Sequence, residues 1–326
     1  MTPAKKLRIA IETCELPHPL FLGHLGPLMR RVEDAMDGAA PRIEHVIGPS
    51  RVGKSMLVNA LKRTFPETKS GGRRHVPVLV VPMPTPVSPL LLPSSVMTAL
   101  GLPLQRSSAP GALVNRMHDQ LKLAGTRVVM FEEASHLVEP GARVPPRAAG
   151  DWFKALADSG MTLLLFGVPR LQRLFAHNEQ LRMRASAPRL FLPYDSRVPD
   201  QLNAFHTCVA TYTNLFREHG YPIELPASAM TYQTYLASGG LVGILSRFMQ
   251  ELASQMAYES PRPLTVADCK SAAEAIETAG APNRRGFDKA EDAHLEVAPA
   301  ALHQAFVHVM HDNDLAVPVV ATGGMR

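Results

Sequence analysis

Cysteine is scarce in this chain. Only three cysteines occur in 326 residues, Cys14, Cys208 and Cys269, and they stand far apart. An odd number at such distances excludes a disulfide framework and the closely paired ligands of a structural zinc site. We therefore expect free thiols in a reducing compartment, which points to the cytoplasm.

Long apolar runs are also missing. No stretch approaches the roughly 20 consecutive apolar residues that a membrane-spanning helix needs. No long apolar region follows the N-terminal residues 1–6, so we expect neither a secretory signal nor a membrane partner. The charge excess is small, with a formal net charge of +5. That value permits contact with nucleic acid without establishing it.

A phosphate-binding loop is the clearest motif that the chain does contain. Residues 48–55 fit the pattern G-x-x-x-x-G-K-[ST], with an apolar run before them and a helix-like run after them. Backbone N–H groups of such a loop surround phosphates, and the helix N-terminus adds partial positive charge. We expect Lys54 to reach the β- and γ-phosphates of ATP and the Ser55 hydroxyl to bind Mg²⁺. The predicted nucleotide-binding residues are Gly48, Pro49, Ser50, Arg51, Val52, Gly53, Lys54, Ser55 and Met56.

Apolar strands alternate with helical patterns through the first part of the chain. This alternation predicts an α/β fold with a central parallel sheet. After Asp195 the strand patterns stop, and four helical patterns predict a small all-helical subdomain. The five expected strands cover 43–47, 76–81, 126–131, 161–166 and 189–192.

These strand and helix patterns divide the chain into four segments. We expect an N-terminal extension at 1–40, the α/β core at 41–195, a helical lid at 196–280 and a tail at 281–326. Residues 69–75 read as a basic, flexible stretch, and 170–186 as one arginine-rich helix. The tail is a candidate for partner contact because exposed termini are free to recruit.

Two carboxylates follow the third expected strand. Glu132 and Glu133 come directly after four apolar residues, where a nucleotide hydrolase places an acid for Mg²⁺ and an acid for the attacking water. We expect Glu132 to hold the Mg²⁺ shell, although Asp is usual there, and Glu133 to act as the base. A solvated acidic pair is the alternative interpretation.

Arginines crowd the approach to the fifth expected strand. An arginine in that place can project into the ATP of a neighbouring subunit and stabilise transition-state charge. Arg182 and Arg184 are the favoured candidates, against the alternative of an exposed basic helix. Two side chains that would contact the nucleotide are not found where they are expected. Gly167 and Val168 offer no side-chain donor after the fourth strand, and Arg247 lies beyond the position expected for a lid arginine.

The combination of these motifs resembles the AAA+ ATPases, and more narrowly the TniB family of transposition ATPases related to TnsC. A proline-rich segment after the second strand and the run Glu-Glu-Ala-Ser-His-Leu at 132–137 are the more specific features. The resemblance covers roughly residues 15–280 and implies an αβα AAA+ core followed by a helical lid. The stretches that carry it are 47–55, 77–84, 131–137, 166–169 and 239–243.

The family resemblance also implies partners. Such proteins use ATP to assemble on double-stranded DNA, without sequence preference, as rings or helical filaments of one chain. They recruit a transposase of the integrase type, and some work with targeting proteins or RNA-guided complexes. By this resemblance Arg106 and Ser107 are the first candidates for DNA contact, with Arg73 and Arg74 as weaker ones. A solvated loop charge is the alternative for each.

Two other functions fit the motifs. One is a replication initiator or helicase loader of the same superfamily. The other is a nucleotide-dependent interaction switch with little hydrolysis, which Glu132 and Val168 favour because both depart from the pattern of efficient hydrolases.

Overall fold

The computed structural model describes residues 2–85, 87–103, 110–139, 144–176, 178–276, 286–287 and 297–319. Its contacts group the chain into two compact units. We call Leu20–Phe191 the sheet unit, and Met1–Pro19 together with Leu192–Arg326 the helical unit. Each is described by itself.

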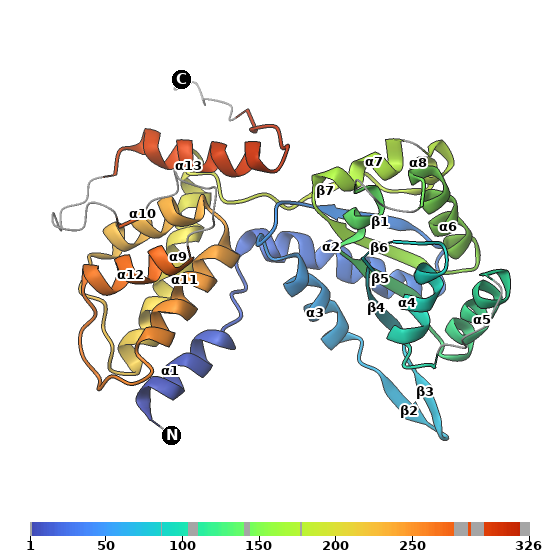
Figure 1. The fold of residues 1–326 in the computed structure, drawn as a ribbon, viewed down its shortest axis with the longest axis horizontal. Helices are drawn as coiled ribbons and strands as arrows, with labels where there is room; N and C mark the ends of the chain where they lie inside the picture. Colours follow the sequence, from blue (N-terminus) through green and yellow to red (C-terminus); the bar gives the residue numbers. More distant parts are fainter. Residues whose placement is uncertain are drawn as a thin grey trace. The chain divides into compact units, whose positions relative to one another are not determined.

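Five parallel strands form the sheet, as the alternating pattern predicts. Their order is β4-β5-β6-β1-β7, so the strand that precedes the phosphate loop lies between β6 and β7 (Figure 1). Because all five run in one direction, the loops that follow β1, β5 and β6 meet at the same edge. The strands are β1 Ile43–Ile47, β4 Val78–Pro82, β5 Val128–Glu132, β6 Thr162–Gly167 and β7 Arg189–Leu190.

The sheet is covered on both faces, which explains its continuous apolar strands. Side chains alternate along each strand, and one face joins a core cluster with helices α4 to α8. Helix α3 contacts β4 and β5 and buries Leu57 and Leu61. The helices of this unit are α2 Pro19–Met36, α3 Lys54–Thr64, α4 Leu91–Ala99, α5 Pro110–Leu123, α6 Pro146–Asp158, α7 Gln172–Ala176 and α8 Glu179–Arg184.

A buried carboxylate ties three elements of the sheet unit together. Glu44 of β1 is 0% exposed and accepts hydrogen bonds from Arg31 Nε (2.8 Å), Ser186 Oγ (2.8 Å) and Arg189 Nε (3.2 Å). Burial alone would raise the pKa of this carboxyl, but its three partners reverse that effect and hold the pKa below its ordinary value. Glu44 therefore fixes α2 and β7 against the strand that carries the phosphate loop.

Two local predictions were wrong. Residues 69–75, expected as a flexible stretch, form the exposed hairpin of β2 Thr68–Ser70 and β3 Arg73–His75. Gly71 and Gly72 turn it with φ of 55° and 74°, the left-handed pair that a tight hairpin turn requires. The single helix expected at 170–186 is broken into a 3₁₀ turn, η2 Pro169–Leu171, and helices α7 and α8. Asn178 starts α8 anew, because its Oδ1 accepts the Leu181 N–H (2.9 Å).

The helical unit contains α1 Pro3–Glu12, α9 Pro199–Glu218, α10 Ala227–Ser238, α11 Val242–Gln255, α12 Val266–Ile276 and α13 Pro299–Asp312. The segment 1–40, expected as one extension, is thus divided: α1 packs on α9 and α11, whereas residues 20–40 belong to the sheet unit. Leu7 and Ile11 are buried on one face of α1. Helix α13, from the expected tail, contacts α10 within the helical unit.

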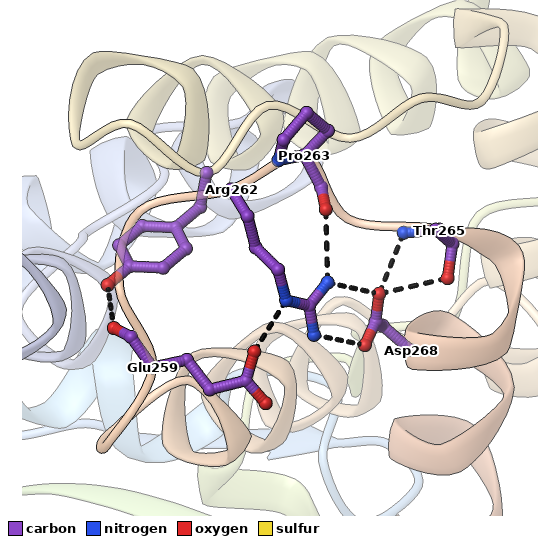
Figure 2. A network of polar contacts seen from close by, with 6 residues as sticks. Glu259, Arg262, Pro263, Thr265 and Asp268 are labelled. Atoms are coloured by element: carbon purple, nitrogen blue, oxygen red, sulfur yellow. Dashed lines mark hydrogen bonds and ion pairs between the residues drawn. The ribbon is translucent and has the colours of Figure 1, made fainter.

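The start of α12 is held by a polar network, shown in Figure 2. The Asp268 carboxylate accepts hydrogen bonds from the Thr265 N–H (2.8 Å) and from both terminal nitrogens of Arg262 (2.8 and 2.9 Å). Arg262 also donates to Glu259. The bond from the Thr265 N–H is one half of a capping box, since the acid of the first turn binds the N–H of the residue before the helix. These hydrogen bonds lower the pKa of Asp268 to about 2.

Two predicted absences can be compared with the structure. Cys14, Cys208 and Cys269 are free thiols in the structure, and Cys208 and Cys269 are buried. Among the described residues, none of the helices has the length and apolarity to cross a membrane.

Candidate functional site

The phosphate loop runs from the end of β1 into the start of α3. The N–H of Gly48 donates to the Gly167 carbonyl (3.2 Å), which joins the loop to the end of β6. Gly53 precedes α3 with φ of 116°, and Arg51 also adopts a left-handed φ of 67°. This alternation of conformations turns successive backbone N–H groups inward, which makes an anion-binding concavity.

Lys54 is the buried cation of this loop. It is 8% exposed, and its Nζ donates to the carbonyl oxygens of Gly48 (2.9 Å) and Pro49 (2.8 Å). Burial lowers the pKa of its ammonium to about 8, and the charge of Glu133 counteracts part of that shift. Phosphate oxygens make stronger, charge-assisted hydrogen bonds than these carbonyls, so a phosphate group bound at the loop would compete with them for the ammonium.

Glu132 and Glu133 stand at the carboxyl end of β5. Glu132 is the last residue of the strand and is partly exposed. Glu133 is exposed and adopts a left-handed φ of 52°, which turns the chain sharply before η1 Ala134–Val138. The negative charge of Glu133 partly offsets the effect of burial on the pKa of Lys54, so the two groups influence each other electrostatically.

Ser55 and Glu132 suit the expected Mg²⁺ by their chemistry. Ser55 is exposed in the first turn of α3, and both residues present oxygen, the ligand that Mg²⁺ prefers. No cluster of three His, Cys, Asp or Glu side chains able to hold a metal occurs among the described residues. A site with so few protein ligands fits a cation that is held mainly by nucleotide phosphates and water.

A polar bridge links the loops that follow β5 and β6. The carboxylate of Glu139 pairs with His136 Nδ1 (2.9 Å) and with Arg170 Nη1 (3.3 Å). Next to this bridge, a Cβ on Gly167 would lie 3.1 Å from the Ser135 nitrogen, so the two loops are in close contact. Gly167 and Val168 carry no polar side chain there, as the sequence indicates. We call His136, Glu139 and Arg170 the loop bridge.

The two arginines expected to act in a neighbouring subunit have different surroundings. Arg184, in the last turn of α8, forms an ion pair with Asp158 of α6. Arg182 is exposed, and its guanidinium has no ion pair or hydrogen bond with the part of the chain that the structure describes. Of the two, Arg182 has the side chain free to contact another molecule.

Comparison with known proteins settles the family. The sequence profile described as "Bacterial TniB protein" matches residues 26–192, which is half of the chain. The chain belongs to the TniB family. Comparison with curated proteins finds no match.

Solved structures agree on the fold of this TniB family member. The Aeropyrum pernix ORC2 protein, solved as ADPNP–ADP complexes, is 13% identical with a TM-score of 0.59, covering 83% of this chain and 72% of that one. Cdc6p from Pyrobaculum aerophilum is 10% identical with a TM-score of 0.59, covering 80% and 68%. The Aeropyrum pernix ORC1 protein in complex with DNA is 15% identical with a TM-score of 0.58, covering 81% and 66%. The predicted AAA+ fold is therefore confirmed.

The residues expected to touch DNA are only partly within the described chain. Arg106 and Ser107 lie outside the described residues. Arg73 is exposed on the β2–β3 hairpin, whereas Arg74 is bound to both carboxylate oxygens of Glu67 and to the Leu100 carbonyl. Within the hairpin, Arg73 therefore has the freer guanidinium. Arg247 of α11 belongs to the helical unit.

Neither the loop bridge nor the buried position of Glu44 was predicted from the sequence. His136 and Glu139 stand three residues apart directly after the acidic pair, which is the spacing at which side chains meet on a 3₁₀ turn. That spacing could have pointed to the contact between these two side chains. Glu44 stands within an apolar strand, and an acid there calls for buried partners.

Proposed function

We propose that this TniB family member is an ATP-binding regulator of DNA transposition, which assembles on duplex DNA and recruits an integrase-type transposase. The observation that carries the ATP-binding part is the buried Lys54 within the phosphate loop, with Glu133 acting on it. Lys54 binds the β- and γ-phosphates, Ser55 and Glu132 complete the Mg²⁺ shell, and Glu133 orients the attacking water.

Family membership supports the transposition role. DNA binding through phosphates needs exposed cations, and Arg73 on the hairpin is one of them, with Arg106 and Ser107 proposed beside it. A filament or ring of this chain would place Arg182 at the nucleotide of the next copy. Targeting proteins or RNA-guided complexes are further proposed partners. The competing role of a replication initiator rests on the shared fold alone.

Nucleotide binding is tested first. Lys54→Ala should weaken binding of a fluorescent ATP analogue by about 10- to 100-fold, because the charge-assisted hydrogen bonds of the ammonium are lost. The matched control is Lys62→Ala, which removes an exposed lysine from the same helix. Equal affinity for Lys54→Ala and Lys62→Ala would refute the assignment of the loop.

DNA binding is tested by fluorescence anisotropy with a labelled duplex, with and without ATP, over a series of salt concentrations. Binding should need ATP, show no sequence preference and fall steeply with salt, as expected for phosphate contacts. Arg106→Ala and Arg73→Ala should weaken it for every duplex, whereas Arg30→Ala, on exposed α2 surface, should not. Absence of binding in ATP at low salt would exclude the transposition role.

A slow nucleotide switch is the second candidate, and specific residues favour it. Glu132 stands where Asp is usual, and Gly167 and Val168 provide no side-chain donor for the γ-phosphate. In this variant of the proposal ATP is an assembly signal, and hydrolysis is a slow release step. Glu133→Gln should then prolong DNA-bound assemblies, seen by electron microscopy with ATP. Failure of Glu133→Gln to assemble would overturn this order of events.

A further inference from the structure

A groove in the sheet unit lies apart from the phosphate loop. It has a volume of about 300 Å³ and is lined by β3, the segment after it, the end of α4 and the end of α5. Its polar lining consists of Arg73, Arg74 and Gln120. Its apolar lining consists of Val76, Leu100, Leu102, Leu123 and Ala124. The volume is at the lower end of sites that hold small ligands, and it suits one anchoring side chain with its neighbours.

The walls of this groove are fixed to each other. Arg74 donates to the Leu100 carbonyl, and the Val76 N–H donates to the Ala124 carbonyl (2.8 Å). The His75 ring packs over Gly125, where its Nδ1 lies 2.3 Å from the position of an ideal Cβ. These three contacts hold the hairpin against the ends of α4 and α5, so the groove is a built feature of the fold.

The groove combines apolar surface with a free positive charge. Val76 and Leu100 are buried at 5% and 4% exposure, whereas Leu123, the last residue of α5, is 70% exposed. Leu123 is an apolar wall that a partner can cover. Arg74 is already neutralised by Glu67, but the exposed Arg73 has no ion pair with any described residue.

This chemistry selects between classes of partner. Duplex DNA presents phosphates, which Arg73 can bind, but it offers nothing to cover Leu123 and Leu102. An acidic peptide offers both groups, an apolar side chain for the groove and a carboxylate for Arg73. The exposed apolar wall therefore favours a peptide over a nucleic acid, and the charge of Arg73 disfavours a basic partner.

We propose that this groove is a docking site for a peptide segment of a partner protein, in which a bulky apolar residue stands beside Asp or Glu. The apolar side chain enters between Leu123 and Leu100, and the neighbouring carboxylate pairs with Arg73. The site is independent of the nucleotide, so the peptide binds with or without ATP.

Selection from a displayed library of random peptides tests the proposal with the full chain as bait. The expected consensus contains one or two bulky apolar residues flanked by acids. A fluorescein-labelled copy of the selected peptide should lose at least about tenfold in affinity for Leu123→Ser and for Arg73→Glu, which corresponds to about 1.4 kcal/mol or more. Leu22→Ser and Arg30→Glu are matched controls, because both are exposed residues on α2 and should leave the affinity unchanged.

Three outcomes would overturn the proposal. The first is a selection without an acidic-apolar consensus, and the second is a selected peptide whose affinity ignores Leu123→Ser. The third is that Leu123→Ser changes the oligomeric state in sedimentation experiments without ATP, which would assign the groove to a second copy of this chain. DNA binding separates the classes of partner, since Leu123→Ser should leave it intact while peptide binding is lost.

Discussion

The backbone carbonyl oxygen of Phe191 lies 2.1 Å from the position that a Cβ on Gly48 would occupy. Phe191 is itself fixed, because it is 1% exposed and its N–H donates to the Ile47 carbonyl (2.8 Å). Its ring also lies 3.4 Å from an ideal Cβ on Gly53, the other glycine of the motif. The buried Phe191 therefore requires glycine at position 48, whereas the positive φ of 116° favours glycine at position 53.

Gly48→Ala should break this arrangement. The added methyl group meets backbone, which cannot rotate away, so the loop must shift from Phe191. We expect loss of ATP-analogue binding and a decrease of roughly 1–3 kcal/mol in the free energy of unfolding. Thermal denaturation followed by fluorescence of Trp152, the one tryptophan, reports on the sheet unit.

Gly23→Ala is the control for that substitution. Gly23 lies inside α2, and nothing stands within 4 Å of its ideal Cβ. Alanine in a helix interior is favoured over glycine by about 0.5–1 kcal/mol, so this variant should be slightly more stable. Equal effects of the two alanines would contradict the role of Phe191.

The affinity for ATP should depend on pH through Lys54. Burial lowers the pKa of its ammonium to about 8, and only the charged form attracts phosphates. Raising the pH from 7 to 9 should weaken binding by about tenfold, since one unit above the pKa leaves roughly a tenth of the ammonium. A titration with a fluorescent analogue measures this, and a flat profile up to pH 9.5 would exclude a lowered pKa.

Without nucleotide, Lys54 should make the free energy of unfolding rise with pH, whereas the affinity for ATP falls with pH. The folded pKa of about 8 lies below the ordinary value of 10.5, so the unfolded chain binds more protons between these two values. The free energy of unfolding therefore rises with pH across that window. Lys54→Met should remove this rise, whereas Lys62→Ala should retain it.

Much of the fold and part of the site follow from local signals. Strands 43–47 and 128–132 are short and mainly apolar, and the phosphate loop is a complete motif. The strands and the loop could therefore be assigned from the sequence alone. The influence of the Glu133 charge on Lys54 agrees with the expectation that parallel strands end at one edge of the sheet. The hairpin at 68–75 was missed because its residues are exposed and carry no apolar alternation.

Contacts between residues that are far apart in the sequence could not be predicted from the sequence alone. The burial of Glu44 depends on hydrogen bonds donated by Arg31, Ser186 and Arg189, which lie elsewhere in the sequence. No local sequence signal predicts these contacts. The placement of α1 with the helical unit depends likewise on contacts with α9 and α11, which lie some 200 residues further along the chain.

Glu139→Gln should affect turnover more than binding. The neutral amide loses the ion pair with Arg170 and the contact of the carboxylate with His136 Nδ1, so the link between the loops after β5 and β6 is weakened. We expect kcat for ATP hydrolysis to fall roughly tenfold with nucleotide affinity unchanged, the pattern of a positioning residue. Glu12→Gln, which breaks the exposed Arg8 pair of α1, is the control. A parallel loss of affinity would show a merely structural role.

Glu44→Gln should destabilise the sheet unit. Breaking a buried pair costs about 3–5 kcal/mol, and Arg31 and Arg189 would both lose their carboxylate. Because its folded pKa lies below the unfolded value of 4.5, the stabilisation is present above pH 4.5 and is lost as pH falls through the folded pKa. Urea denaturation followed by Trp152 fluorescence at several pH values measures both effects, with exposed Glu33→Gln as control.

Asp268→Asn should loosen the start of α12. The neutral amide loses the charged hydrogen bonds from Arg262 and the cap on the Thr265 N–H, at a cost of about 1–3 kcal/mol. The stabilisation from this acid persists above pH 3.8 and disappears as pH falls towards the folded pKa of about 2. Hydrogen exchange of the α12 amides should become faster in the variant, while the amides of β1 keep their protection. Unchanged exchange in α12 would contradict the capping role.

The position of α1 has a consequence for biosynthesis. Leu7 and Ile11 are 0% and 1% exposed in the folded protein, but their partner helices α9 and α11 are translated only after the whole stretch 20–191. At typical ribosome speeds this delay is on the order of ten to thirty seconds. During that time the sheet unit can complete its own core, whereas the apolar face of α1 has no native partner to cover it. A nascent chain stalled after Phe191 should therefore be the species of this protein that chaperones hold longest.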